Sequence, residues 1–188
     1  IFPDPFLGIR PRNRDNVLRK LDVAGIKFKT LAPDCLRLAN GTRVDVLLNI
    51  DKEVVVQDLN SQKSLDGFSL EDSKCLDLQV WDCCAASGGK SLLLYDKCPG
   101  VRLLVSDLRQ NILYNLQNRF GRAGIKNYQT RVWDASSALI NQKFDLVICD
   151  APCSGSGTWS RTPEQICFFN QEKMEHYPIL QKKIAINA

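Results

Sequence analysis

The sequence has only one histidine, no Cys-x-x-Cys pair and no long run of apolar residues. A membrane-spanning helix needs roughly 18 consecutive apolar residues, and a signal segment needs a basic start followed by an apolar stretch. Zinc sites combine cysteine pairs with histidines, so these spacings predict no metal site. We therefore expect a soluble, cytoplasmic protein that binds no metal.

Eight cysteines are present among the 188 residues. Cys83, Cys84 and Cys149 lie inside apolar, strand-like runs, where reduced thiols behave as small hydrophobic side chains. Disulfides are typical of secreted proteins, so we expect reduced cysteines in a reducing compartment. The chain begins with Ile1 rather than methionine, and we expect the natural protein to extend beyond both of its ends.

The first 43 residues carry nine basic side chains against four aspartates, an excess of five positive charges. Such a segment can follow a phosphate backbone, or it can be an ordinary solvated surface. The basic residues are Arg10, Arg12, Arg14, Arg19, Lys20, Lys27, Lys29, Arg37 and Arg43.

Two units are predicted, a small α+β unit over residues 1–72 and an α/β unit over residues 73–188. In the first, apolar periodicity predicts a helix capped by Asp15 and ended by Gly25. It also predicts strands at residues 31–38, 44–50 and 53–57, the first two joined by a hairpin turn at Asn40-Gly41.

In the second unit, strands alternate with helices. The strands are predicted at residues 76–84, 101–105, 128–133 and 144–150, and the helices begin at Lys90 and Gln110. Alternation of this kind produces a parallel sheet with right-handed crossovers. We therefore predict a Rossmann-like, doubly wound fold.

Polar residues follow these strands at the edge where such folds bind ligands. The turn Ser87-Gly88-Gly89 opens a helix, whose N-terminus favours a charged ligand. Asp107 ends the next strand and is placed to accept hydrogen bonds from ribose hydroxyls. Asp134 ends the third strand and is either an adenine contact or a helix cap. Together they indicate a nucleoside-containing cofactor.

Two phosphate-binding alternatives are disfavoured by the glycine spacing. A P-loop requires glycine at the position of Cys84, and the dinucleotide motif G-x-G-x-x-G is absent. A cofactor without a pyrophosphate, such as S-adenosylmethionine, fits better.

Two longer motifs carry a family resemblance. The segments DCCAASGGKS (residues 82–91) and DAPCSGSG (residues 150–157) resemble the signature motifs of the S-adenosylmethionine-dependent RNA cytosine-C5 methyltransferases. The resemblance continues through residues 158–164 and 180–188, and backward to residues 56–58 and 61–62, so it covers nearly the whole chain. It implies a class I methyltransferase core, S-adenosylmethionine as cofactor, and ribosomal or transfer RNA as partner.

The same resemblance implies roles for individual residues. Those implied at the cofactor are Cys84, Ala85, Ala86, Ser87, Gly88, Gly89, Lys90, Asp107, Asp134 and Asp150. Those implied in catalysis are Cys153, Asp150 and Lys90. The chain departs from the family pattern at two positions. Ser87 stands where proline is usual, which loosens the turn, and Ile112 stands where arginine is common.

The reaction requires a thiolate, because cytosine C5 accepts a methyl group only after a nucleophile has added at C6. In the family the attacking cysteine lies in a later Thr-Cys segment, which we expect after Ala188, and the cysteine matching Cys153 assists release of the product. In the related DNA enzymes the Pro-Cys cysteine itself attacks, which leaves Cys153 open as the nucleophile. Trp159 and Arg161 either clamp the target base or pack against the small unit.

Two other functions remain open: a catalytically silent RNA-binding protein with the same fold, and a methyltransferase for another acceptor.

Overall fold

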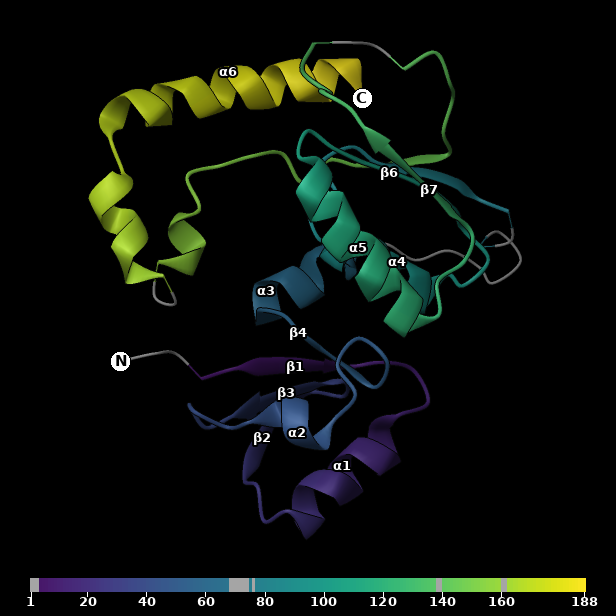
Figure 1. The fold of residues 1–188 in the computed structure, drawn as a ribbon, viewed down its shortest axis with the longest axis vertical. Coiled ribbons are helices and arrows are strands. Elements are labelled where there is room, and N and C mark those ends of the chain that lie inside the picture. Colours follow the sequence, from purple (N-terminus) through teal and green to yellow (C-terminus); the bar gives the residue numbers. More distant parts are fainter. Residues whose placement is uncertain (1–3, 68–74, 76, 138–139, 160–161) are drawn as a thin grey trace.

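The computed structural model describes residues 4–67, 75, 77–137, 140–159 and 162–188, with the backbone alone for 171–173 (Figure 1). These residues form two four-stranded sheets. In chain order the elements are β1 (Phe6–Ile9), α1 (Arg14–Val23), β2 (Phe28–Ala32), β3 (Cys35–Leu38), α2 (Val44–Leu47), β4 (Val54–Val56), α3 (Leu59–Gln62), η1 (Lys63–Leu65), β5 (Gln79–Asp82), α4 (Gly89–Lys97), β6 (Arg102–Asp107), α5 (Gln110–Ala123), β7 (Tyr128–Val132), β8 (Leu146–Ile148), η3 (Ser156–Thr158), η4 (Pro163–Phe168) and α6 (Gln171–Asn187).

The first sheet is antiparallel and has the strand order β2-β3-β1-β4. In β1 the buried residues Leu7 and Ile9 alternate with partly exposed ones, as in a strand with one face on a core. Helix α1 adds Val17 and Leu21 to that core, because residues four apart lie on one face of a helix.

The second sheet is parallel and has the order β7-β6-β5-β8. Its strand β5 contributes to two cores. Val80 packs with residues of α4 and α5 on one face, and Trp81 packs with Ile184 of α6 on the other. The Trp81 indole N–H donates to Ser106 Oγ at 2.9 Å. Helices on both faces of a parallel sheet confirm the predicted α/β, Rossmann-like class.

Several predicted elements of the first unit are wrong. Residues 31–38 form two strands, β2 and β3, separated by a turn at Pro33-Asp34, because proline cannot donate to a strand ladder. Asn40-Gly41 does form a turn, but a short helix, α2, follows it in place of the predicted strand. The central strand β1 was not expected, since four residues carry too short a pattern to be recognised.

Other boundaries differ less. Helix α1 begins at Arg14 after the N-cap Asn13, so the predicted cap Asp15 lies in the first turn instead. Its negative charge is favourable there because the helix dipole is positive at this end. Strand β8 is only three residues long, where a strand over residues 144–150 was predicted. It pairs parallel with β5, with Asp82 opposite Ile148.

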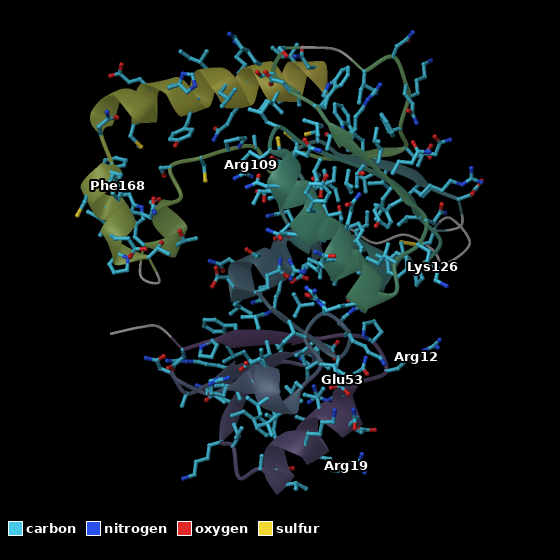
Figure 2. All side chains as sticks on the ribbon, viewed as in Figure 1. Arg12, Arg19, Glu53, Arg109, Lys126 and Phe168 are labelled. Carbon is cyan, nitrogen blue, oxygen red and sulfur yellow. A yellow bond between two sulfur atoms is a disulfide. The ribbon has the colours of Figure 1, made fainter. Side chains whose placement is uncertain are left out.

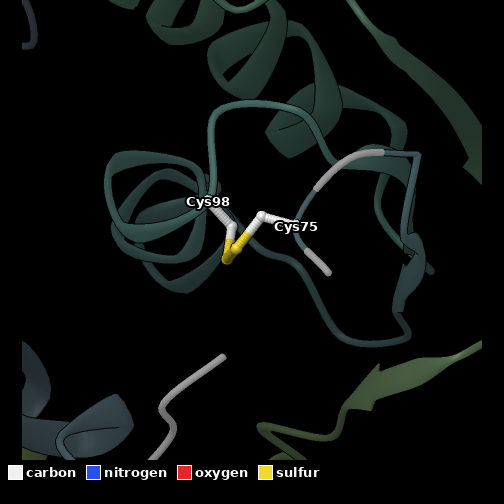
Figure 3. The surroundings of a disulfide bond; sticks show 2 residues. All are labelled: Cys75 and Cys98. Carbon is white, nitrogen blue, oxygen red and sulfur yellow. A yellow bond between two sulfur atoms is a disulfide. The ribbon is translucent and has the colours of Figure 1, made fainter. Parts of the chain in front are cut away.

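One disulfide departs from the expectation of reduced cysteines. Cys75 and Cys98 are bonded, with their sulfur atoms 2.06 Å apart (Figure 3). Cys98 caps the C-terminus of α4 and Cys75 lies just before β5. The helix runs back alongside the strand, so their Cα atoms come within 5.1 Å, a separation that a disulfide can bridge. The other six cysteines are free thiols.

No helix among the described ranges is both long enough and apolar enough to cross a membrane. Within the same ranges, no three histidine, cysteine or acidic side chains come together as a metal site would require.

Candidate active site

The turn between β5 and α4 lies at the carboxyl end of the parallel sheet. Its backbone is tied to both neighbours of β5, because the Cys83 amide donates to Ile148 O and the Ala85 amide to Ser106 O. The turn itself needs left-handed backbone at Ala86 (φ +46°) and Gly88 (φ +79°). A side chain at Gly88 would come within 2.6 Å of the Phe120 ring, so glycine is required there on two grounds.

Asp82 ends β5 directly beneath this turn and is 1% exposed. Its Oδ2 accepts a hydrogen bond of 2.6 Å from Ser91 Oγ, while Oδ1 has no partner among the described residues. Burial, together with the charge of Asp150, raises the pKa of Asp82 to about 6, against the hydrogen bond from Ser91 and a weaker contact with the Cys84 amide that does not satisfy Oδ1. The chain therefore holds a buried carboxylate oxygen that lacks a donor.

Sequence reasoning missed Asp82 as a site residue. The signal was present, because a charged residue directly after a buried apolar strand is rarely there for packing.

Asp107, at the end of β6, lies on the other side of the turn and is 5% exposed. Its Oδ2 accepts the Ala86 amide N–H at 3.0 Å, and its carboxylate pairs with the Arg109 guanidinium. Burial alone would raise the pKa of Asp107, but the bonds from Arg109 and Ala86 outweigh it and lower the pKa. The structure thus places Asp107, which was predicted to contact the cofactor, against the predicted turn.

Asp134 follows β7 and is occupied locally. Its Oδ1 accepts both the Ser136 amide N–H at 2.9 Å and the Ser136 hydroxyl at 2.7 Å. These two bonds lower the pKa of Asp134. The carboxylate anchors its own turn, which is close to the capping role that the sequence left open.

Lys90 and Asp150 form an ion pair across the end of the sheet. Lys90 is in the first turn of α4, and Asp150 lies two residues after β8. The Lys90 side chain is 23% exposed and that of Asp150 is 54% exposed. Two residues that the resemblance assigned to catalysis are therefore in direct contact.

A cavity of about 240 Å³ opens between this edge of the sheet and the first unit. It combines most of the predicted turn with Asp82, Asp150 and the segment that follows β4. Its lining residues are Val56, Gln57, Asp58, Ser61, Asp82, Cys84, Ala85, Ala86, Ser87, Gly89, Lys90, Arg119 and Asp150. Asp107, Asp134 and Cys153 do not line it.

A larger cavity of about 400 Å³ lies between the first sheet and α4, lined in part by Arg10, Val55, Leu92 and Asp96. It contains none of the predicted site residues and lies away from the carboxyl ends of the strands. The smaller cavity is therefore the better candidate site, because ligands of open α/β sheets bind at those ends.

Comparison with known families decides the relationship of the chain. A model of the family described as 16S rRNA methyltransferase RsmB/F matches residues 72–188. This chain belongs to the RsmB/F methyltransferase family. Ribosomal RNA small subunit methyltransferase B of Escherichia fergusonii is 30% identical over 158 residues, which make up 81% of this chain and 36% of the relative. The protein of that name from Shigella sonnei shows the same identity and coverage. The chain thus spans about a third of the length of these curated relatives.

Solved structures share the fold. The crystal structure of PH0851 aligns with 100% of this chain and 44% of its own, with a TM-score of 0.87 and 23% identity. That of NSun6 from Pyrococcus horikoshii with SFG aligns with 100% of this chain and 72% of its own, with a TM-score of 0.77 and 14% identity. The alignments span both sheets, and membership of the RsmB/F family confirms the resemblance drawn from the two motifs.

In the RsmB/F motif after β8, Cys153 is an exposed free thiol. The neighbouring Pro152 carbonyl accepts a hydrogen bond of 2.9 Å from Gln181 of α6, which ties the loop to that helix. Cys84 is the thiol that lines the cavity, and a hydrogen bond from Cys83 lowers the pKa of Cys84.

Beyond this loop the chain forms an arm that carries η3, η4 and α6 (Figure 1). Trp159 packs edge-on against Phe169 of the arm, with ring centroids 5.1 Å apart. This contact lies within the arm and differs from packing against the first unit, which was one of the two predicted alternatives. Arg161, the other predicted base contact, lies outside the described residues.

The basic residues of the first unit are only partly available to RNA. Figure 2 shows Arg12 and Arg19 pointing away from the protein, and both are exposed. Arg10, by contrast, is 9% exposed and pairs with Asp96 at 2.7 Å. Three others also form ion pairs, namely Lys20 with Glu53, Arg37 with Asp4 and Arg43 with Asp45. Arg10 is therefore a buried structural residue. Fewer positive charges are free at the surface than the excess of five in the first 43 residues suggests.

Proposed function

We propose that the protein containing this chain transfers a methyl group from S-adenosylmethionine to C5 of a cytosine in RNA, through a covalent cysteine adduct. The observation that carries the proposal is the meeting of both family motifs at one cavity, where Lys90 of the first pairs with Asp150 of the second. A ribosomal or transfer RNA substrate is consistent with the family and with a cytoplasmic location.

The residues present fit the cofactor. S-adenosylmethionine carries an ammonium group, and Asp82 Oδ1 is a buried carboxylate oxygen without a donor at the cavity wall. The amides of the turn from Cys84 to Lys90 and the N-terminus of α4 suit its carboxylate. The resemblance assigns Asp107 to the ribose and Asp134 to the adenine, although neither lines the cavity and their hydrogen bonds in this structure go to protein groups. When bound, the cofactor supplies an electrophilic methyl group.

The chain's own residues would act on the base. Asp150 would hold the cytosine by accepting from its exocyclic amine, the donor by which acidic residues recognise cytosine. A thiolate would add at C6, which would raise electron density at C5. C5 would then accept the methyl group that the cofactor supplies, and the electron pair of the broken S–CH3 bond would stay on the sulfonium sulfur. Loss of the C5 proton to a base and breakage of the C6–S bond then restore the aromatic ring. We assign Cys153 to this release, and Lys90 to holding Asp150 in place.

The two units, each built on one sheet, have different proposed roles. We propose that residues 1–72 form a unit that guides RNA and that residues 73–188 form the core that binds S-adenosylmethionine and catalyses transfer. Residues 68–74, where the boundary falls, are outside the described part of the chain. The cavity includes Val56, Gln57, Asp58 and Ser61 of the first unit, so this unit also forms one wall of the site.

Methyl transfer by the full-length protein tests the function. With S-adenosylmethionine labelled in its methyl group and total RNA from cells lacking the enzyme, we expect label in 5-methylcytidine after nuclease digestion and mass spectrometry. Label in another nucleoside would assign a different acceptor. RNA binding without label would instead support the catalytically silent alternative.

The role of Cys153 is tested by Cys153→Ala. If Cys153 assists release, the variant should accumulate an RNA–protein adduct that survives denaturing electrophoresis, while the unmodified enzyme shows almost none. Cys167→Ala is the control, since Cys167 is also an exposed free thiol but lies outside both motifs. Loss of every adduct in Cys153→Ala would make Cys153 the nucleophile.

A further inference from the structure

We propose that Arg119 is a positioning residue for cofactor binding, which holds the turn at Ser87 and ties it to Asp51 of the first unit. The proposal rests on the assignment of the turn to S-adenosylmethionine. Arg119 projects from α5, and its side chain is 15% exposed. It also lines the cavity, although neither family motif includes it.

One guanidinium makes both connections. Arg119 Nε donates to Asp51 Oδ1 at 2.7 Å. Its Nη1 lies 3.4 Å from both the carbonyl oxygen and the hydroxyl of Ser87. The planar, five-donor head of arginine allows a single side chain to bridge two separate acceptors in this way.

The anchor for this bridge is buried and hydrogen-bonded on several sides. Asp51 is 3% exposed, and its other carboxylate oxygen accepts two bonds from Arg122, at 3.1 and 2.8 Å. The Asp51 carbonyl accepts from buried Arg10 at 2.6 Å, and its amide donates to Val54 O at 2.7 Å. Charge-assisted bonds of this kind are among the stronger ones in proteins. Movement of the first unit would therefore be transmitted to Arg119.

The turn has a specific need for such support. Ala86 and Gly88 on either side of Ser87 both have left-handed backbone, which is unfavourable for alanine. Proline, usual in the family at this position, would restrict the backbone from within by fixing φ near −65°. Ser87 lacks that restriction and is not among the residues with positive φ. Arg119 restrains the turn through its contacts with Ser87, in place of the restraint that a proline ring would impose on the backbone.

Arg122 provides a matched control. It lies one turn further along α5 and binds the same carboxylate, and its hydrogen bonds among the described residues all go to Asp51. Removing it weakens the anchor without removing a contact to Ser87. A general loss of packing between the units would therefore affect both arginines, whereas a positioning role affects Arg119 alone.

The test measures the dissociation constant of S-adenosylmethionine by calorimetry on the full-length protein. Arg119→Met should weaken binding about 10-fold, the value expected for a lost charge-assisted hydrogen bond, with kcat at saturating cofactor little changed. Arg122→Met should stay within about twofold of the parent. Ser87→Pro introduced into Arg119→Met should restore affinity to within about threefold, and Ser87→Pro alone closes the cycle.

Equal losses in Arg119→Met and Arg122→Met, or no restoration by proline, would overturn the proposal. If Arg119→Met does not fold, Arg119→Lys serves instead, because one ammonium can keep Asp51 but not both acceptors of Ser87, and a loss of about 3- to 10-fold is expected. Asp107→Asn separates this inference from the site assignment. If it leaves cofactor affinity unchanged, the assignment itself fails; if it lowers affinity while Arg119→Met does not, only the role of Arg119 fails.

Discussion

Replacing Asp150 with asparagine should lower kcat for RNA methylation by about 100-fold or more, with a smaller effect on cofactor affinity. Asparagine keeps the size of the side chain but removes the charge that pairs with Lys90 and reduces its strength as an acceptor for the cytosine amine. Groups that contact the reacting base typically contribute 100-fold to 10 000-fold to the rate. Single-turnover measurements with saturating S-adenosylmethionine and RNA would isolate this step from binding.

Asp145→Asn is the matched control for this substitution. Asp145 stands at the other end of β8, is exposed, and accepts the Gln79 amide at 2.8 Å. A loss of strand order should appear in both variants, whereas a loss of chemistry should appear only in Asp150→Asn. A kcat within about threefold of the parent for Asp150→Asn would remove Asp150 from the reaction.

Lys90→Met gives an independent measure of the same pair. Asp150 would keep its charge but lose the contact that orients it, so we expect a smaller fall in kcat than for Asp150→Asn. Lys97→Met should leave the rate unchanged. Lys97 lies at the end of α4 opposite the turn and pairs with Asp66, 4.0 Å away, instead of with a residue of the site.

The parallel sheet was predictable because its signals are local and agree with each other. Strands β5 and β6 are apolar runs buried on both faces, each ends in an acid, and each is followed by a helix start. The family motifs lie at those strand ends, so the turn at Ser87 and the position of Asp107 could be read from the sequence. The same agreement is absent from the first unit, where Pro33 interrupts one strand and β1 has only four residues.

The contacts that complete the site could not be read in this way. Gln57 and Arg119 reach the turn from elements far away in sequence, and Arg10, counted among the basic surface residues, crosses to Asp96 in α4. Such pairings depend on how two units pack, which periodicity and spacing do not encode. The missing donor of Asp82 likewise emerges only when the neighbours of a buried side chain are known.

That missing donor leads to the second large effect. Asp82→Asn should stabilise the cofactor-free protein at pH 8 by up to about 3 kcal/mol and change its stability little at pH 4. Burial raises the pKa of Asp82 to about 6 from an ordinary value of 3.8, so the fold favours the neutral carboxyl. A shift of about two units corresponds to about 3 kcal/mol. The stabilisation that the neutral Asp82 carboxyl provides is fully present below its ordinary pKa of 3.8. It is lost as the pH rises through about 6.

Urea unfolding at pH 4, 6 and 8 would measure this difference. Asparagine has nearly the same shape, and its amide oxygen can still accept from Ser91. The substitution removes the charge and places an NH2 group where Oδ1 stands. Asp107→Asn is the control of opposite sign. The bonds from Arg109 and Ala86 lower the pKa of Asp107, so its charged form stabilises the fold above the ordinary pKa and that variant should lose stability at pH 8. An equal gain for Asp82→Asn at pH 4 and pH 8 would exclude the buried charge as its cause.

The same substitution should act in the opposite direction on the cofactor. If Asp82 Oδ1 receives the ammonium group of S-adenosylmethionine, Asp82→Asn should weaken its binding by about 10- to 100-fold, since a hydrogen bond between charged groups contributes about 1.5–3 kcal/mol. Burying the charge of Asp82 beneath the turn is unfavourable in the free protein and becomes favourable once a cation faces the carboxylate. A variant that gains stability at pH 8 but keeps full affinity would show that Asp82 burdens the fold without holding the cofactor.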